Sequence, residues 1–211
     1  AHRGAGGHRD PVRRGLILAA PASSSGKTLV TLGLLRLLRR RGRRVAAAKA
    51  GPDYIDPSFH AAACGGPCLN LDPWAMRPET LAGLVGALGA GAELVLCEGV
   101  MGLFDGTGPG GEAGSTAELA RSTGWPVVLV VDARRQGASV AALVAGFARH
   151  DCRVPLAGVI LNRVAGARHR AGLEAALARH LPDLPRLGAV VEDQALMLPH
   201  RHLGLVPAGE H

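Results

Sequence analysis

The N-terminal part of the chain joins a short apolar run to an amphipathic stretch through a loop of small residues. The run Leu16–Ala20 is typical of a buried strand, and the loop that follows ends in Gly26-Lys27-Thr28, just before the apolar-periodic stretch Leu29–Leu38. A strand, a small-residue loop ending in Gly-Lys-Thr and a helix form the layout of a phosphate-binding P-loop. This order restricts the fold strongly, because strands that feed directly into helices belong to parallel α/β sheets.

The residue types of the loop suit the binding of ATP. Successive backbone N–H groups of the loop and of the helix N-terminus form a concave anion site. Lys27 would neutralise the β- and γ-phosphates, and the Thr28 hydroxyl would ligate Mg²⁺. The general pattern has glycine where Pro21 stands, and the alternative is an ordinary helix capped by Ser24 or Ser25.

Apolar runs and helical stretches alternate along the rest of the chain. The predicted strands are Leu16–Ala20, Arg44–Ala50, Leu94–Glu98, Pro126–Asp132, Leu156–Asn162, Leu187–Val190 and Leu203–Val206. The predicted helices are Lys27–Arg41, Pro78–Leu88, Ser115–Thr123, Ala138–His150 and Ala167–His180. This alternation predicts an α/β fold with a mostly parallel sheet and helices on both faces.

Length and composition indicate one globular domain. The chain has 211 residues, of which 47% are hydrophobic and 19% charged, so residues 15–211 can form a well-buried core. Residues 1–14 are rich in Gly, His and Arg and are expected to be a disordered lead-in rather than a signal peptide.

Composition also limits the location and the partners. Four cysteines are too few for a disulfide framework and favour a reducing cytoplasm, and no apolar run is long enough to cross a membrane. Much of the net charge of +7 lies in arginines after residue 35 without interleaved aromatic residues, so nucleic acid is not an expected partner.

Polar residues follow five of the predicted strands. The carboxyl ends of parallel strands share one edge of a sheet, where ligands bind. Besides the P-loop, this edge would collect Lys49 with the loop Gly51–Pro57, the segment Glu98–Gly106, Asp132 and Asn162. The chain has only two lysines, Lys27 and Lys49, and both fall on this edge.

Several of these residues have a chemistry that suits phosphoryl transfer. Glu98 could ligate Mg²⁺ opposite Thr28, and Lys49 could stabilise a transferring phosphoryl group. Asp53 and Asp56 lie in a loop stiffened by two prolines, where one could join the metal shell and the other orient substrate or ammonia. The alternatives are a surface glutamate, a solvated lysine and an Asx turn before a short segment at 58–63.

A glycine-rich loop and a histidine complete this predicted edge. Leu103 and Phe104 are expected to be exposed in a mobile substrate loop that carries Asp105. His60 lies nearest to the edge among the histidines and is expected to be a structural helix residue.

Five strings of residues resemble the cobyrinic acid a,c-diamide synthases, a group that includes the enzymes acting on hydrogenobyrinic acid. The resemblance covers about residues 15–211 and is most specific in Lys49–Pro57 and Glu98–Gly106. The other strings are Ala20–Thr28, Asn70–Trp74 and Arg201–Val206. The resemblance implies a P-loop NTPase of the dethiobiotin synthetase-like type.

The resemblance also implies an activity. Members of the family are C–N ligases of cobalamin biosynthesis that use ATP, Mg²⁺ and glutamine-derived ammonia. They amidate the a- and c-side-chain carboxylates of a corrinoid through an acyl phosphate. Nickel-sirohydrochlorin a,c-diamide synthase uses the same chemistry, and a partitioning ATPase switch or a silent nucleotide-binding module are rivals. The partitioning ATPases carry a lysine at the position of Ala22 and lack the Lys49–Pro57 loop.

The roles implied for individual residues follow from the matching strings. Catalytic roles fall on Lys27, Lys49, Asp53, Asp56 and Asp105. ATP would be bound by Ser23, Ser24, Ser25, Gly26, Lys27, Thr28, Asn162, Val206 and Pro207. The metal would be held by Thr28, Asp53 and Glu98. Substrate would meet Tyr54, Asp56, Gly102, Leu103 and Asp105.

Two departures from the family pattern matter. Ser24 replaces a glycine of the P-loop, which would affect ATP affinity if that position needs a positive φ. Family members carry a C-terminal glutaminase domain that is expected to be absent from this chain, so ammonia would come from elsewhere. The residues leave open a homodimer, the presence of cobalt in the substrate and the order of amidation.

Overall fold

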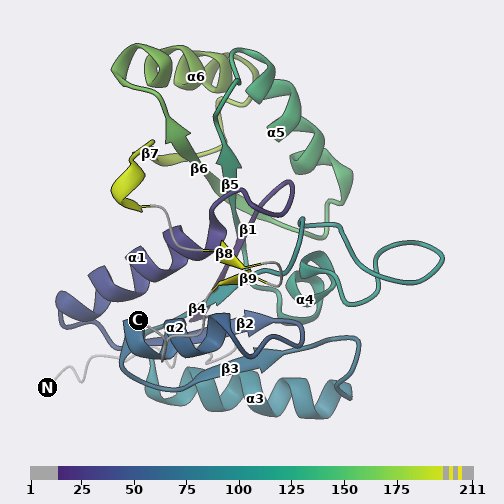
Figure 1. Ribbon diagram of the computed structural model, residues 1–211. Helices are drawn as coiled ribbons and strands as arrows, with labels where there is room; N and C mark the ends of the chain where they lie inside the picture. The colour runs from purple at the N-terminus through teal and green to yellow at the C-terminus, as the bar shows by residue number, and fades with distance from the viewer. Residues whose placement is uncertain (1–13, 197–199, 202–203, 206–211) are drawn as a thin grey trace, which may run out of the picture.

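The computed structural model describes residues 14–196, 200–201 and 204–205 (Figure 1). Seven strands form one parallel sheet in the order β3-β2-β4-β1-β5-β6-β7. These strands are β1 (Gly15–Ala19), β2 (Val45–Ala50), β3 (Cys68–Leu71), β4 (Leu94–Glu98), β5 (Val127–Asp132), β6 (Leu156–Val164) and β7 (Arg186–Val191). The helices are α1 (Lys27–Arg40), α2 (Asp56–Cys64), α3 (Pro78–Gly91), α4 (Thr116–Thr123), α5 (Ser139–His150) and α6 (Ala167–His180).

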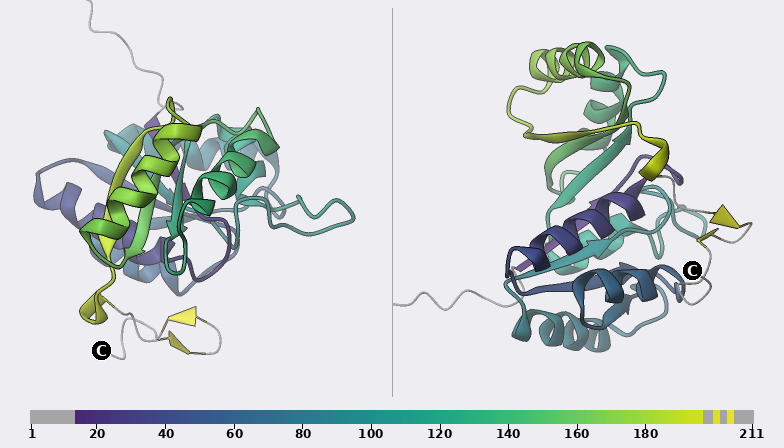
Figure 2. Two further views of the ribbon diagram at one scale, coloured as in Figure 1. Left: turned by 90° about the horizontal axis from the view of Figure 1, so that it is seen from above. Right: turned by 60° about the vertical axis from the view of Figure 1, so that its left-hand side comes forward.

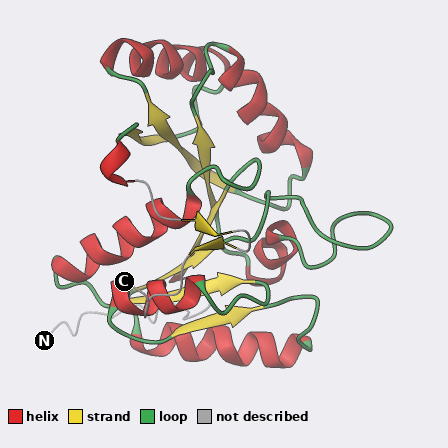
Figure 3. Cartoon of the chain, viewed as in Figure 1, coloured by secondary structure: helices red, strands yellow, loops and turns green. Residues whose placement is uncertain are grey.

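Helices flank the sheet, as Figure 3 shows in red and yellow. A short 3₁₀ turn at Gln194–Leu196 follows β7, and β8 (His200–Arg201) pairs antiparallel with β9 (Gly204–Leu205). The predicted α/β class and its parallel sheet are therefore confirmed. The predicted strand Leu203–Val206 overlaps β9 but extends beyond the described residues.

Two elements, α2 and β3, were not predicted. Helix α2 is short and alanine-rich, so its apolar periodicity is weak, and β3 has only four residues. Both pack beside β2, and α2 also packs on α1, as the right-hand view of Figure 2 shows. Tertiary packing rather than local pattern therefore stabilises them.

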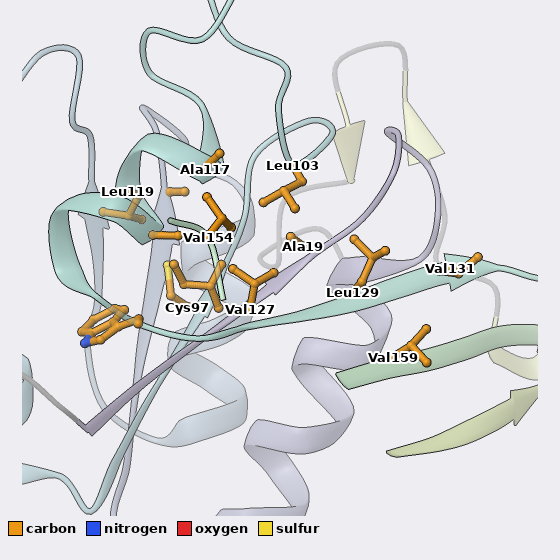
Figure 4. Packing of buried hydrophobic residues seen from close by; sticks show 14 of the residues in the cluster. Ala19, Cys97, Leu103, Ala117, Leu119, Val127, Leu129, Val131, Val154 and Val159 are labelled. Atoms are coloured by element: carbon orange, nitrogen blue, oxygen red, sulfur yellow. The ribbon is translucent and has the colours of Figure 1, made fainter. Parts of the chain in front are cut away.

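Alternating residues of the strands divide the core into two layers. In β1, Ile17 and Ala19 join the larger cluster, which also contains residues of α3, α4, α5 and α6. Figure 4 shows part of this cluster from close by. Leu18 points to the opposite face and packs with Val30 and Leu35 of α1. This period of two is the geometry of a strand buried on both faces.

The order of the strands brings three loops together. β1 lies at the centre of the sheet, with β4 and then β2 on one side of it. Lys49 of β2 is the register partner of Glu98 of β4, and Glu98 is also the partner of Leu18 of β1. The P-loop, the loop after Lys49 and the loop after Glu98 therefore leave neighbouring strands at one edge.

Candidate functional site

The P-loop is closed by backbone geometry rather than by a side-chain cap. Gly26 precedes α1 with a φ of 89°, and among the described residues no side chain caps the first turn. Ser25 Oγ instead donates to the carbonyl of Ala22 at 2.8 Å. The alternative of an ordinary serine-capped helix is therefore wrong, and the N–H groups of the first turn remain free for an anion.

Lys27 bends back over the loop. Its Nζ donates to the carbonyl oxygen of Met101 at 2.6 Å, and the side chain is buried. Burial lowers the pKa of Lys27, although the nearby Glu98 carboxylate opposes this. The ammonium group thus lies beside the P-loop, and its hydrogen-bond partner within the described part of the chain is a neutral carbonyl.

Ser24 occupies the conformation that glycine would favour. Its φ is 62°, in the left-handed region, so the position does need a positive φ. Arg163 Nη1 donates to the Ser24 carbonyl at 2.7 Å and pairs with Asp132, also at 2.7 Å. The adjacent Asn162 donates from Nδ2 to the Ser25 carbonyl at 2.9 Å. Two side chains of β6 and one of β5 therefore hold the strained loop in place.

Asn162 lies within β6 rather than at its end, because the strand continues to Val164. Its Oδ1 is buried and has no hydrogen-bond partner among the described residues. Its Nδ2 would collide with a Cβ at position 26, so glycine is needed there for space as well as for φ. The structure thus gives Asn162 a loop-holding contact, and its predicted role toward adenine stays a prediction.

Glu98 is the centre of the site. Its side chain is 1% exposed, and its Oε1 accepts from Thr28 Oγ1 at 2.7 Å and from Lys49 Nζ at 3.1 Å. Burial alone would raise the pKa of Glu98, but Lys49, His60 and Thr28 together lower it to about 2. The carboxylate is therefore ionised at neutral pH, and the alternative of a surface glutamate is wrong.

Lys49 is buried between carboxylates. Its Nζ lies 2.8 Å from Asp56 Oδ2 and 3.8 Å from Asp53 Oδ2. Burial would lower the pKa of Lys49, but Glu98 and Asp56 outweigh it and raise the pKa above its ordinary value. The pKa of Asp56 is also raised, because the effect of its burial exceeds the lowering effect of Lys49. The solvated lysine is therefore excluded, since Lys49 keeps its charge inside the protein.

Asp53 shapes the loop before α2. Its Oδ1 accepts from the backbone N–H groups of Ile55 and Asp56, at 2.9 and 3.1 Å, which is an Asx turn. Asn70 of β3 donates to the backbone carbonyl of Asp53. The Asx alternative is thus observed, while Oδ2 still faces Lys49.

The loop after β4 corrects one predicted substrate residue. Leu103 is fully buried in the core (Figure 4), so the expectation of an exposed side chain that meets substrate is wrong. The reason is its backbone: its N–H bonds to Ala20 and its carbonyl to Ala117, which draws the side chain inward. Phe104 is half-buried, and it stacks on Phe147 with ring centroids 5.6 Å apart.

The remaining predicted site residues differ in their exposure. Asp105 is exposed, and its Oδ2 accepts from the N–H of Gly102 at 2.9 Å. Gly102 is tightly enclosed, because a Cβ there would meet Asp105 and the carbonyl of Pro21. Tyr54 is 86% exposed. Ser23 is exposed in the P-loop, and Val206 and Pro207 lie outside the described residues.

His60 belongs to this site although only a structural role was predicted for it. It is fully buried in α2, and its Nε2 lies 2.7 Å from Glu98 Oε2. Its contact was not predicted because the fold, and not the spacing in the sequence, brings His60 of α2 to Glu98 of β4. The available signal was its position four residues after Asp56 and three residues after the end of the Lys49–Pro57 string.

The oxygen donors of the site suit Mg²⁺ better than a soft metal. In the described part of the chain, no group of three His, Cys, Asp or Glu side chains is arranged to hold a metal ion. Mg²⁺ needs fewer protein ligands, because it keeps waters and phosphate oxygens. The Thr28 hydroxyl and the ionised Glu98 carboxylate, in contact at 2.7 Å, fit that requirement. No helix in the described part is long and apolar enough to cross a membrane.

Comparison with known proteins places the chain in a family. The model for the CobQ/CobB/MinD/ParA nucleotide binding domain matches residues 16–206. Hydrogenobyrinate a,c-diamide synthase of Brucella anthropi is 57% identical over 199 residues, which cover 94% of this chain and 45% of that protein. The enzyme of the same name from Rhizobium meliloti is 56% identical, with coverage of 93% and 45%. The chain thus spans less than half the length of these curated relatives.

Solved structures at lower identity share the fold. Chloroplast FtsY from Physcomitrella patens aligns with a TM-score of 0.60 at 17% identity, over 86% of this chain and 59% of that one. The signal recognition particle 54 kDa protein from Aeropyrum pernix, solved with GDP, gives 0.60 at 21% identity, over 89% and 45%. The P-loop on a parallel sheet and the match over nearly the whole chain show that it belongs to the CobQ/CobB/MinD/ParA nucleotide-binding domain family.

Proposed function

We propose that this chain is the ATP-dependent synthetase part of a hydrogenobyrinate or cobyrinate a,c-diamide synthase. The observation that carries the proposal is its identity of 56–57% to the synthases named above over 93–94% of its length. The buried cluster of Lys49, Asp56 and Glu98 beside the P-loop supports it, because Lys49 and Asp56 come from the loop that the partitioning ATPases lack. The reaction would amidate two side-chain carboxylates of a corrinoid.

The chemistry requires activation of a poor electrophile. A substrate carboxylate oxygen attacks the γ-phosphorus of ATP, the bond to the β-phosphate oxygen breaks, and an acyl phosphate and ADP form. Ammonia then attacks the carbonyl carbon, the bond to the phosphate oxygen breaks, and the nitrogen loses a proton. The products are an amide, ADP and phosphate, and catalysis depends on positioning and charge neutralisation.

The residues on the P-loop side would hold the nucleotide. The free N–H groups before α1 and Lys27 would bind the phosphates, with Ser23, Ser24, Ser25 and Gly26 forming the cradle. Thr28 and Glu98 would hold Mg²⁺, with Asp53 Oδ2 close to the same cluster. When bound, Mg²⁺ would neutralise charge on the β- and γ-phosphates.

The residues after β2 and β4 would serve the transferring group and the substrate. Lys49 keeps a full positive charge next to Glu98, where a leaving γ-phosphoryl group needs it. Tyr54, Asp56, Gly102 and Asp105 line the edge on which the corrinoid would lie. Asn162, Val206 and Pro207 would contact the adenine base, as the family resemblance implies.

The proposal extends to the parts of the reaction outside this cluster. Residues 15–211 would form the synthetase unit, and ammonia would come from a glutaminase. The oligomeric state is open, with a homodimer as one assembly to test by light scattering.

Mass spectrometry of the two acids gives the direct test. Hydrogenobyrinic and cobyrinic acids are incubated separately with the protein, ATP, Mg²⁺ and ammonia, and we expect stepwise replacement of OH by NH₂ in at least one acid. Lys27→Met should abolish the product, whereas Arg170→Met, a change in an exposed pair on α6, should not. ATP hydrolysis that is independent of either acid, with no amide formed, would instead support a partitioning-type switch.

A further inference from the structure

The two oxygens of the Glu98 carboxylate have different partners. Oε1 accepts from Thr28 and Lys49, whereas Oε2 lies 2.7 Å from His60 Nε2. The contact is within ion-pair distance but falls short of a well-aligned hydrogen bond, and neither atom has a hydrogen-bond partner among the described residues. Both side chains are buried, so leaving either atom unpaired would cost about 1–3 kcal/mol. The contact between Nε2 and Oε2 therefore offsets part of the cost of burying both atoms.

Cys68 contacts the other ring nitrogen of His60. The Sγ of Cys68, the first residue of β3, lies 3.7 Å from Nδ1 of His60, within hydrogen-bond reach of a sulfur atom. Burial raises the pKa of Cys68 to about 12, so the sulfur keeps its proton at neutral pH. A thiol that donates to Nδ1 leaves the imidazole proton on Nε2, which is the nitrogen that faces Glu98.

We propose that Cys68 and His60 are positioning residues, in which the Cys68 S–H fixes the tautomer of His60 and the Nε2–H of His60 holds Oε2 of Glu98. Oε1 then stays directed at Thr28 and Lys49. Without this support, the Glu98 carboxylate could rotate about χ3, and Lys49 alone would set its orientation. Outer partners of this kind orient a metal-binding group without touching the metal.

The inference rests on the role proposed above for Glu98 toward Mg²⁺, but not on the identity of the corrinoid substrate. Its tests therefore use the free protein and ADP with Mg²⁺. If the protein fails to amidate either acid but passes these tests, only the proposed function fails. If it amidates normally but fails these tests, only the relay is refuted.

Nitrogen NMR of the histidine rings tests the tautomer directly. The signals of His60 are identified by their loss in His60→Gln, and we expect the Nε2–H tautomer in the unaltered protein. Cys68→Ala should shift the ring toward a mixture of tautomers. Cys64→Ala is the matched control, because Cys64 is also buried but its Sγ hydrogen-bonds to the backbone carbonyls of Ala61 and Gly66. A dominant Nδ1–H tautomer, or no response to Cys68→Ala, would overturn the proposal.

Calorimetric binding of ADP at a series of Mg²⁺ concentrations tests the consequence. His60→Leu should weaken Mg²⁺-dependent binding by roughly 10- to 100-fold, the usual effect of losing an outer partner. His60→Gln keeps a donor at the place of Nε2 and should recover most of this loss, whereas metal-free ADP binding should change little in either variant. Equal weakening in both variants would indicate simple packing and refute the relay. If His60→Leu does not fold, the tautomer measurement decides alone.

Discussion

Replacing Lys49 by methionine tests whether the buried charge cluster is a coupled unit. The change keeps most of the length of the side chain but leaves the carboxylates of Glu98 and Asp56 without their shared ammonium group. We expect the free energy of unfolding at pH 7 to fall by roughly 3–5 kcal/mol, the usual cost of breaking a buried ion pair from one side.

The magnitude can also be estimated from Glu98. Its pKa falls from 4.5 to about 2 in the folded protein, and each pKa unit corresponds to about 1.36 kcal/mol, so the network contributes about 3 kcal/mol. Because the folded pKa is depressed, this stability is fully present above pH 4.5 and is lost as the pH falls toward 2. In Lys49→Met the burial of Glu98 is no longer opposed by its main counter-charge, so the folded pKa of Glu98 rises and less stability should be lost between pH 4.5 and pH 2.

Urea unfolding followed by far-UV circular dichroism provides the assay. A double-mutant cycle with Glu98→Gln isolates the coupling, which should be roughly 2 kcal/mol or more because the groups lie 3.1 Å apart. The control cycle is Arg170→Met with Glu174→Gln, an exposed pair on α6 whose coupling should be below about 0.5 kcal/mol. Additive effects at Lys49 and Glu98, or a cost of Lys49→Met below about 1 kcal/mol, would refute the reasoning.

Three further substitutions test the loops around this cluster. Ser24→Gly should stabilise the protein by up to about 1 kcal/mol in urea unfolding and strengthen ADP binding, because it relieves the positive φ; weaker ADP binding would contradict this. Leu103→Ala should cost roughly 3–5 kcal/mol, against well under 1 kcal/mol for Leu37→Ala at a 41% exposed position, and similar costs would mean that Leu103 is not a core residue. Asn162→Ala should cost about 1–2 kcal/mol and weaken ADP binding through the freed Ser25 carbonyl; unchanged stability and binding would rule out its loop-holding role.

Much of the fold could be predicted from the sequence because its helices and central strands have clear periods. The helices predicted at 27–41, 138–150 and 167–180 match α1, α5 and α6 closely, since each has enough turns for an apolar face to repeat. The sequence did not predict α2 and β3, because these elements are short and gain their stability from neighbouring elements. The exposed position predicted for Leu103 was wrong for another reason: Gly102 and Gly106 lie near it in sequence, but its backbone bonds to Ala20 and Ala117 turn its side chain into the core.

The candidate site, like the fold, could be predicted from the sequence only in part. The sequence by itself determined the P-loop with Lys27 and Thr28, and it predicted that Lys49 and Glu98 would share one edge, because parallel strands end together. Only the tertiary structure decided that Lys49 is held by Asp56 and Glu98, that Ser24 adopts a positive φ, and that His60 and Cys68 stand behind the Glu98 carboxylate. The physical reason is that strand ends follow from local patterns of apolar residues, whereas contacts among side chains depend on the order of the strands in the sheet.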